Sequence, residues 1–181
     1  MLIFAHTGIT LGAAALMAAG ANRHEKKSWL ASLSKYADIR FLIIGSILPD
    51  IIDKPIGHLF FSNGRIFCHT LLFFILVTII GVAVYQRTKN LWGLSLAVGV
   101  LAHLLLDSMW ITPRTLFWPL MGWDFEKLDI AGYLKKWFQL LMSERVVAIA
   151  EIIGFIITVW AGLLIISKKQ VTALLKTGKI R

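Results

Sequence analysis

The sequence predicts an all-α integral membrane protein, a polytopic transmembrane helix bundle of about four spans plus a short, partly inserted helix. Three observations predict this fold class. Apolar residues make up 57% of the 181 residues, which exceeds the roughly 45–50% of soluble domains. The mean hydropathy is +0.74. Charged residues amount to 16% and gather between long apolar runs. We expect residues 1–181 to form a single membrane domain.

The first span is predicted at residues 2–21, which is about the length that a helix needs to cross roughly 30 Å of hydrocarbon. The run lacks a basic segment before it and carries His6 in its first turns. Both features favour a retained helix over a cleaved signal peptide. His6 should then lie close to one membrane face.

A short or half span is predicted at residues 36–52, which end within the motif LPDIIDKP. This motif places the carboxylates of Asp50 and Asp53 near the end of an apolar helix. Such a helix end is tolerated at membrane depth only where protein or a water-filled cavity surrounds it.

Three further spans are predicted at 66–86, 91–111 and 146–167. The tight basic turn QRTKN makes the first two antiparallel, and Pro113 and Pro119 end the helix that precedes them. An outer loop follows at residues 112–145. Within it, the segment GYLKKWFQLLM predicts a short interfacial helix.

The net charge of +9 indicates topology rather than a nucleic-acid partner. Basic residues do not alternate with aromatic ones on a soluble face, so we expect no nucleic-acid binding. The segments predicted on one side of the membrane hold twelve Lys and Arg residues, and those predicted on the other side hold seven. The positive-inside rule therefore predicts a cytoplasmic C-terminus.

His103 and Asp107 are the strongest candidate site residues, because a spacing of four puts both on one face of an apolar helix. An ionisable pair there is costly unless it finds partners or a cation. A neutral hydrogen bond between the two is the alternative without metal. The predicted topology brings further candidate ligands to the same outer end of the bundle: His6, Asp50, Asp53 and His69, with His58 and Glu151 as additional candidates.

Each of these further residues also has a structural explanation. His58 lies in a connector where a solvated histidine is common, and Glu151 could pair with a histidine or with Arg114 or Arg145. Taken together, nitrogen and oxygen ligands suit a divalent metal, zinc before manganese or iron. The single Cys68 excludes an internal disulfide and a Cys-rich zinc site.

The segments LPDIIDKP, GRIFCHTLL and GVLAHLLLDSMW, followed by TLFWPL, resemble the YdjM-like family of inner-membrane proteins. The resemblance implies a metal-dependent hydrolase. The chain departs from the family pattern at Gly64, where members often carry a histidine, and in the spacing of Asp50 and Asp53.

A weaker similarity is to the zinc-dependent phospholipase C and P1-nuclease type of helical phosphodiesterase. The order of His and Asp residues carries it, through His6, Asp53, His69, His103 and Asp107. This similarity implies a metal cluster that cleaves phosphoester bonds.

The predicted function is therefore a membrane-bound metal-dependent hydrolase that acts on a lipid or another amphiphilic phosphoester at the outer membrane face. Asp107 and Arg65 are the predicted catalytic residues, with Arg65 binding an anionic group of the substrate. An ion or small-solute transporter is the alternative, although the cytoplasmic halves of the spans are nearly all apolar. A non-catalytic scaffold with a structural metal is the third hypothesis.

Overall fold

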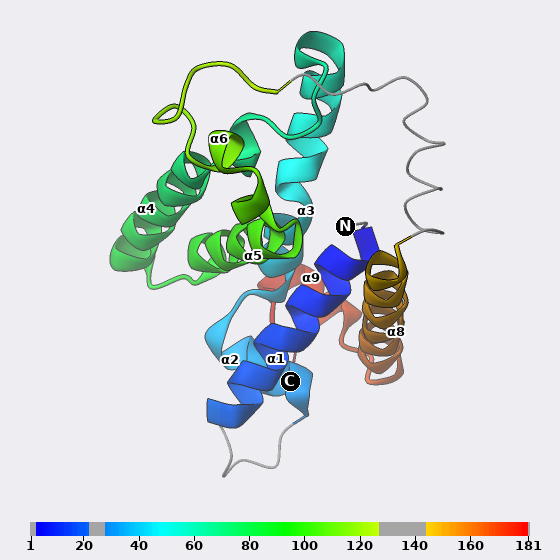
Figure 1. Cartoon of the computed structure of the whole chain (residues 1–181). Helices are drawn as coiled ribbons and strands as arrows, with labels where there is room; N and C mark the ends of the chain where they lie inside the picture. Colours follow the sequence, from blue (N-terminus) through cyan, green and yellow to red (C-terminus); the bar gives the residue numbers. More distant parts are fainter. Residues whose placement is uncertain (1–2, 22–27, 127–143, 181) are drawn as a thin grey trace.

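The computed structural model describes residues 3–21, 28–126 and 144–180, and within them every regular element is a helix (Figure 1). The elements are η1 (Ala5–Ile9), α1 (Thr10–Ala21), α2 (Trp29–Tyr36), α3 (Ile39–Ile56), η2 (Gly57–Phe61), η3 (Phe67–His69), α4 (Leu71–Thr88), α5 (Trp92–Leu106), η4 (Met109–Ile111), α6 (Pro113–Leu116), α8 (Arg145–Ser167) and α9 (Val171–Thr177). The predicted all-α fold class is confirmed for these residues.

Among the residues that the structure describes, two helices are long and apolar enough to cross a membrane. They are α4, with 18 residues and a mean hydropathy of 1.9, and α8, with 23 residues and a mean hydropathy of 2.4. The other two apolar helices, Ala5–Ala21 and Trp92–Leu106, are shorter. The expected four spans are therefore not all confirmed. Large apolar side chains are exposed along the whole of α4 and α8, which suits a lipid environment.

Side-chain caps mark where three of the helices begin. Ser28 and Thr70 accept hydrogen bonds from the backbone three residues further on, at the starts of α2 and α4. Asp38 accepts one from Arg40 N at the start of α3. These caps satisfy backbone N–H groups that lack partners within the helix.

Several predicted boundaries were wrong. The helix predicted from residue 66 begins at Leu71, because Asp53 accepts hydrogen bonds from the backbone of residues 66, 68 and 69. The short span predicted at 36–52 is a helix over Ile39–Ile56 that continues through two prolines. The helix predicted over 91–111 ends at Leu106.

The predicted outer loop, residues 112–145, contains α6. The interfacial helix predicted within that loop lies outside the described residues.

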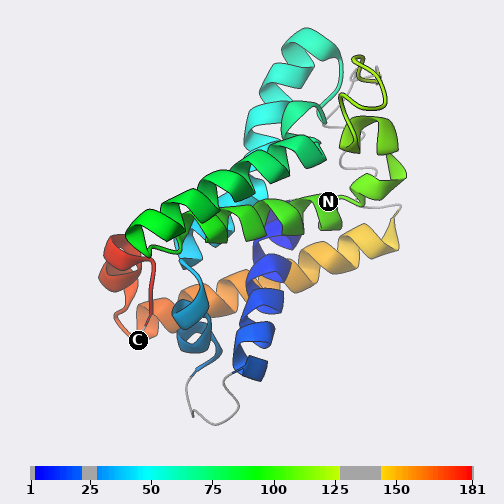
Figure 2. The ribbon, with the colours of Figure 1, turned by 90° about the vertical axis from the view of Figure 1, so that its left-hand side faces the viewer.

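The helices pack as two closely joined pairs, which set the frame of the candidate site. α3 packs against α5 with Gly45 and Gly99 at the contact, and η1 packs against α8 with Gly8 and Gly154 at the contact. A Cβ atom at any of these four positions would meet backbone atoms of the facing helix. Small residues of this kind let apolar helices approach closely. Figure 2 also shows α4 and α5 side by side.

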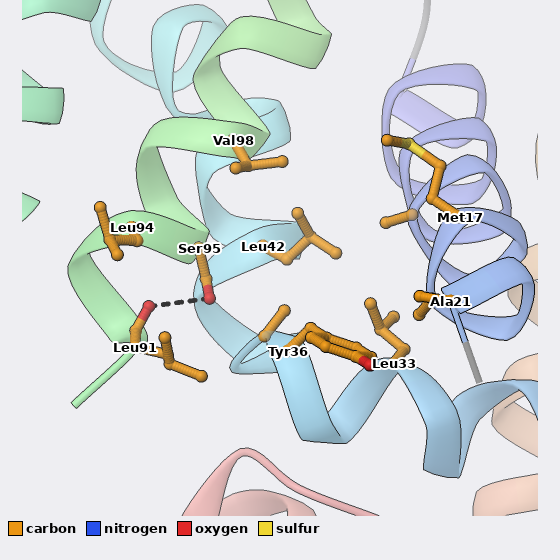
Figure 3. A pocket seen from close by; sticks show the side chains of 12 residues that line it. Met17, Ala21, Leu33, Tyr36, Leu42, Leu91, Leu94, Ser95 and Val98 are labelled. Atoms are coloured by element: carbon orange, nitrogen blue, oxygen red, sulfur yellow. Dashed lines mark hydrogen bonds between the residues drawn. The ribbon is translucent and has the colours of Figure 1, made fainter. Parts of the chain in front are cut away.

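The buried apolar core lies among α1, α2, α3 and α8, where it includes Leu11, Leu30, Leu33 and Leu42. Next to it, an apolar cavity of about 340 Å³ opens between α1 and α5, with α2 and α3 also contributing to its lining (Figure 3).

Candidate metal centre

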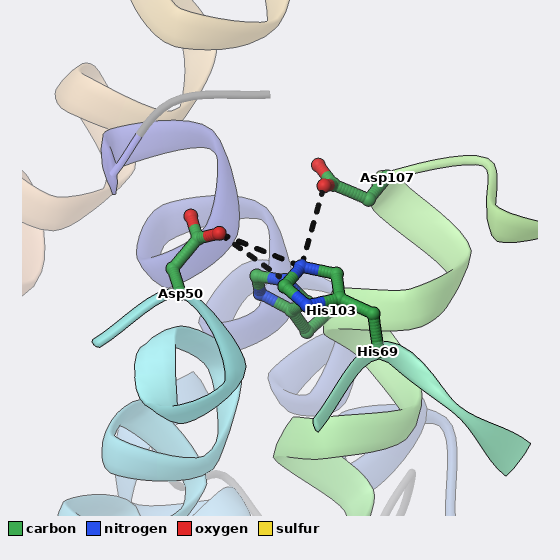
Figure 4. A group of neighbouring side chains, drawn as sticks. All are labelled: Asp50, His69, His103 and Asp107. Carbon is green, nitrogen blue, oxygen red and sulfur yellow. Dashed lines mark hydrogen bonds and ion pairs between the residues drawn. The ribbon is translucent and has the colours of Figure 1, made fainter. Parts of the chain in front are cut away.

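Four predicted ligands come together at one end of the α3–α5 pair: Asp50, His69, His103 and Asp107 (Figure 4). One ligand atom from each lies within 4.8 Å of those of the others. His69 Nε2 is 3.1 Å from His103 Nε2, 3.5 Å from Asp50 Oδ1 and 3.8 Å from Asp107 Oδ2. Both histidines are fully buried. The cluster therefore joins α3, η3 and the end of α5.

Asp53 fixes the position of His69. Its Oδ2 atom lies 2.8 Å from His69 Nδ1 and accepts hydrogen bonds from the N–H groups of Ile66, Cys68 and His69. A carboxylate can only accept, so the ring nitrogen next to it carries the hydrogen. In a neutral imidazole, the lone pair of His69 is then on Nε2 and faces the cluster.

The ring of His103 is also held by a contact at its Nδ1 atom, in this case with a backbone carbonyl of α3. Its Nδ1 atom lies 2.8 Å from the carbonyl oxygen of Ser46 on α3. Gly45 precedes Ser46 directly, and Gly99 lies one turn before His103, so the close approach of these glycines brings α5 near enough for the contact to form. Because a carbonyl oxygen accepts, His103 also turns the lone pair of its Nε2 atom toward the cluster.

The Asp107 carboxylate contacts two other ionisable side chains, those of Arg65 and His6. It follows the last residue of α5, and its N–H donates to the carbonyl of His103, which keeps the helical spacing that the sequence predicts. Its Oδ2 atom lies 2.9 Å from Arg65 Nη2, and its Oδ1 atom lies 3.2 Å from His6 Nε2. The Arg65 side chain is 40% exposed, so part of the guanidinium remains open to a ligand.

Asp50 offers one oxygen to the cluster. Its Oδ2 atom lies 2.6 Å from Lys54 Nζ. Its Oδ1 atom is buried and makes no hydrogen bond among the residues that the structure describes. The pairing with Lys54 was missed in the sequence, although a spacing of four on a helix would have indicated it.

His6 lies beside the four residues. Its ring stacks on His103 with 4.1 Å between centroids, and its Nε2 atom lies 3.2 Å from Asp107 Oδ1. Glu151 on α8 fixes this segment by accepting hydrogen bonds from the N–H groups of Phe4 and Ala5, at 3.2 and 3.1 Å. Glu151 thus contacts the backbone next to His6 rather than the cluster.

The remaining candidates lie outside the four-residue group. Asp53 contacts the cluster through His69 Nδ1. His58 is in η2, and its ring lies close to the position that a Cβ atom at Gly64 would take. Burial raises the pKa of the Cys68 thiol to about 12 with the help of the Asp53 carboxylate, and Cys68 is not one of the four residues of the group.

The donor set fits a divalent metal ion. Two imidazole lone pairs that face each other at 3.1 Å repel unless a cation or proton lies between them. Two nitrogens bound to one zinc ion at 2.0–2.1 Å lie about 3.1–3.4 Å apart at near-tetrahedral angles. Two carboxylates complete a set of nitrogen and oxygen donors that also suits manganese and iron.

Comparison with known proteins identifies the family of this chain. The sequence matches the family described as YdjM inner membrane protein over residues 1–173. The chain belongs to the YdjM family. No curated protein and no solved structure matches it. The weaker similarity to phospholipase C and P1 nuclease is therefore not supported, whereas the YdjM resemblance and the inner-membrane assignment are confirmed.

Proposed function

We propose that this YdjM-family protein is a metal-dependent hydrolase whose substrate is a lipid or another amphiphilic phosphoester at the outer face of the inner membrane. The observation that carries the proposal is the pair of buried Nε2 atoms, 3.1 Å apart, each with its hydrogen-bearing Nδ1 atom held by a partner. Buried nitrogens in this arrangement are prepared for a cation.

Asp50, His69, His103 and Asp107 would hold the metal, and His6 is the proposed fifth ligand. A divalent metal bound there would supply a hydroxide near neutral pH and would polarise a phosphoryl oxygen. Asp53 and the Ser46 carbonyl keep both imidazole rings oriented during the reaction, since each holds an Nδ1 atom at 2.8 Å.

Arg65 is the proposed binder of the phosphate group. Its guanidinium has five N–H donors in a planar fork that matches phosphate oxygens. One nitrogen contacts Asp107, and the side chain is 40% exposed. Arg65 can therefore bind substrate while it stays anchored to the cluster.

The proposed membrane arrangement keeps all four predicted spans. The segment Ala5–Ala21 reaches the lower length limit for a span, which is about 17 residues. Trp92–Leu106 is shorter, and the turn η4 extends it toward the outer face. The C-terminus is placed in the cytoplasm by the positive-inside rule.

Metal analysis of detergent-purified protein tests the proposal. We expect stoichiometric zinc, manganese or iron in the wild type and its loss in His103→Ala, because that substitution removes a buried ligand. His58→Ala is the matched control, since His58 lies outside the cluster, and it should keep the metal. Only proteins that keep the metal should hydrolyse a phosphodiester substrate in mixed micelles. A metal-free wild type, or metal retained by His103→Ala, would contradict the proposal.

A further inference from the structure

A basic cavity lies at the end of the bundle opposite the metal centre. Its volume is about 550 Å³, and it is bordered by the turn between α4 and α5, by α9 and by the start of α3. Lys89, Lys176 and Lys179 contribute to its lining. Leu91, also in its lining, precedes His103 by twelve residues, which corresponds to about 18 Å along a helix. The cavity is therefore separate from the candidate metal centre.

The three lysines give this cavity an uncompensated positive charge. Its one acidic lining residue, Asp38, receives hydrogen bonds at both carboxylate oxygens from Arg40, which also lines the cavity. Among the residues that the structure describes, no carboxylate pairs with any of the three lysines. The cavity thus has the charge of an anion-binding site with a formal excess of three.

Lys176 and Lys179 belong to a C-terminal segment whose backbone is held by hydrogen bonds to α2 and α3. Arg40 Nη1 donates to the Leu175 carbonyl at 2.6 Å, and Ile39 N donates to the Gly178 carbonyl at 3.0 Å. Ile180 is buried, and its N–H donates to Ser34 Oγ at 2.8 Å. Lys176 and Lys179 therefore belong to a docked segment, which lowers the entropy cost of binding a ligand.

An apolar cavity adjoins the basic one. It is the cavity of Figure 3, where Met17 and Ala21 on α1 face Leu94 and Val98 on α5. Leu91 lines both cavities, and Ala37, the neighbour of Asp38, lines the apolar one. The hydrogen bond from Asp38 N to Ser95 Oγ lies at the boundary between them. One surface thus places a cationic cavity beside an apolar groove.

We propose that this pair of cavities binds one anionic phospholipid. Its phosphate group lies among Lys89, Lys176 and Lys179, and an acyl chain lies in the groove between α1 and α5. Charge complementarity selects an anionic headgroup, and the adjoining apolar groove selects an amphiphile over a free anion. This proposal does not depend on the hydrolase activity or on the metal.

Native mass spectrometry of the full chain in non-ionic detergent tests this proposal. Phosphatidylglycerol and phosphatidylcholine with identical chains are the probes, and inorganic phosphate is tested separately by thermal shift. We expect one retained phosphatidylglycerol, no retained phosphatidylcholine, and no stabilisation by millimolar phosphate. The triple variant Lys89→Gln, Lys176→Gln, Lys179→Gln should weaken phosphatidylglycerol binding by roughly a hundredfold.

The matched control is Arg87→Gln, Lys168→Gln, Lys169→Gln, which removes the same charge from the last turn of α4 and from the turn before α9, outside the cavity. The two triple variants are also matched in backbone conformation, because each changes one lysine whose φ is positive, Lys89 or Lys169. The control should bind phosphatidylglycerol like the wild type. Val98→Trp, which fills the apolar groove, should also weaken binding. Equal effects of the two triple variants, retention of phosphatidylcholine, or equally strong binding of inorganic phosphate would overturn the proposal.

Discussion

Asp50 and Asp53 are three residues apart on one helix, yet their surroundings differ. Asp53 is fully buried, and its carboxylate accepts from three backbone N–H groups and faces His69 Nδ1. Asp50 pairs with Lys54 on one side and turns its other oxygen to the cluster. Asp53 therefore shapes the chain around the site, whereas Asp50 offers an oxygen atom to the candidate metal centre.

Because of this difference, we expect the same substitution, Asp to Asn, to have different effects on stability at the two positions. Asp53→Asn places an amide N–H₂ against several donors, and it should lower the free energy of unfolding by about 2–4 kcal/mol. It should also weaken metal binding by roughly 10–100-fold. Asp50→Asn should cost about 1 kcal/mol or less in stability, because its pair with Lys54 is partly exposed. It should still lose the metal.

Chemical unfolding in detergent and metal titration measure the two effects. The prediction is wrong if both variants unfold at the same denaturant concentration. At this scale the sequence indicated Asp53 as a candidate ligand. Its contacts with the backbone of residues 66, 68 and 69 could not be predicted, because they depend on how the connector folds back onto α3.

At the scale of elements, close helix contacts position the histidines. Gly154 on α8 faces the backbone of Phe4 and Ala5, directly before His6. A second glycine on the same helix, Gly162, would place a Cβ atom in open space. The two glycines therefore form a matched pair for substitution.

We expect Gly154→Ala to lower the free energy of unfolding by about 1–3 kcal/mol, since the added methyl group meets backbone that cannot move aside. Gly162→Ala should be neutral or stabilising by up to about 1 kcal/mol, because alanine favours a helix interior. Thermal unfolding in detergent measures both. Equal destabilisation by the two variants would contradict the close packing of η1 on α8.

The apolar runs predicted the all-α fold class, because each run is long and is bounded by charged residues. The predicted number of spans is not confirmed. The apolar runs did not predict where the helices end. The helix α4 starts only at Leu71 because the side chain of a distant residue binds the backbone before it. The helix α5 ends at Leu106 because the chain turns at Ser108, which has a positive φ. Tertiary contacts decide these boundaries, and hydropathy does not record them.

At the scale of the whole molecule, the four candidate ligands come together because successive apolar segments run in opposite directions. Helices that run up and down bring residues 50, 69 and 103–107 to one end, and the structure has them there. The basic turn and the tail, which the sequence also assigned to one side, lie together at the opposite end. The orientation of these ends in the membrane is a prediction.

Cysteine labelling of intact spheroplasts with a membrane-impermeant maleimide measures that orientation. Glu144→Cys places an exposed thiol directly before α8, and Thr172→Cys places one in α9, which follows α8. We expect labelling of Glu144→Cys in intact spheroplasts and of Thr172→Cys only after permeabilisation. The wild type is the control, because its single cysteine, Cys68, is buried and its pKa is about 12.

The opposite labelling pattern would place the metal centre at the cytoplasmic face. Labelling of both positions from one side would show that α8 does not cross the membrane.

The contact between Glu151 and the first helix has a consequence for the order of biosynthesis. The ribosome makes Phe4 and Ala5 long before Glu151, yet their N–H groups bind its carboxylate in the finished fold. Residues 50–107, which supply four ligands, also emerge before α8. The contact that Glu151 makes next to His6 can therefore form only after the residues of the candidate metal centre have all been made.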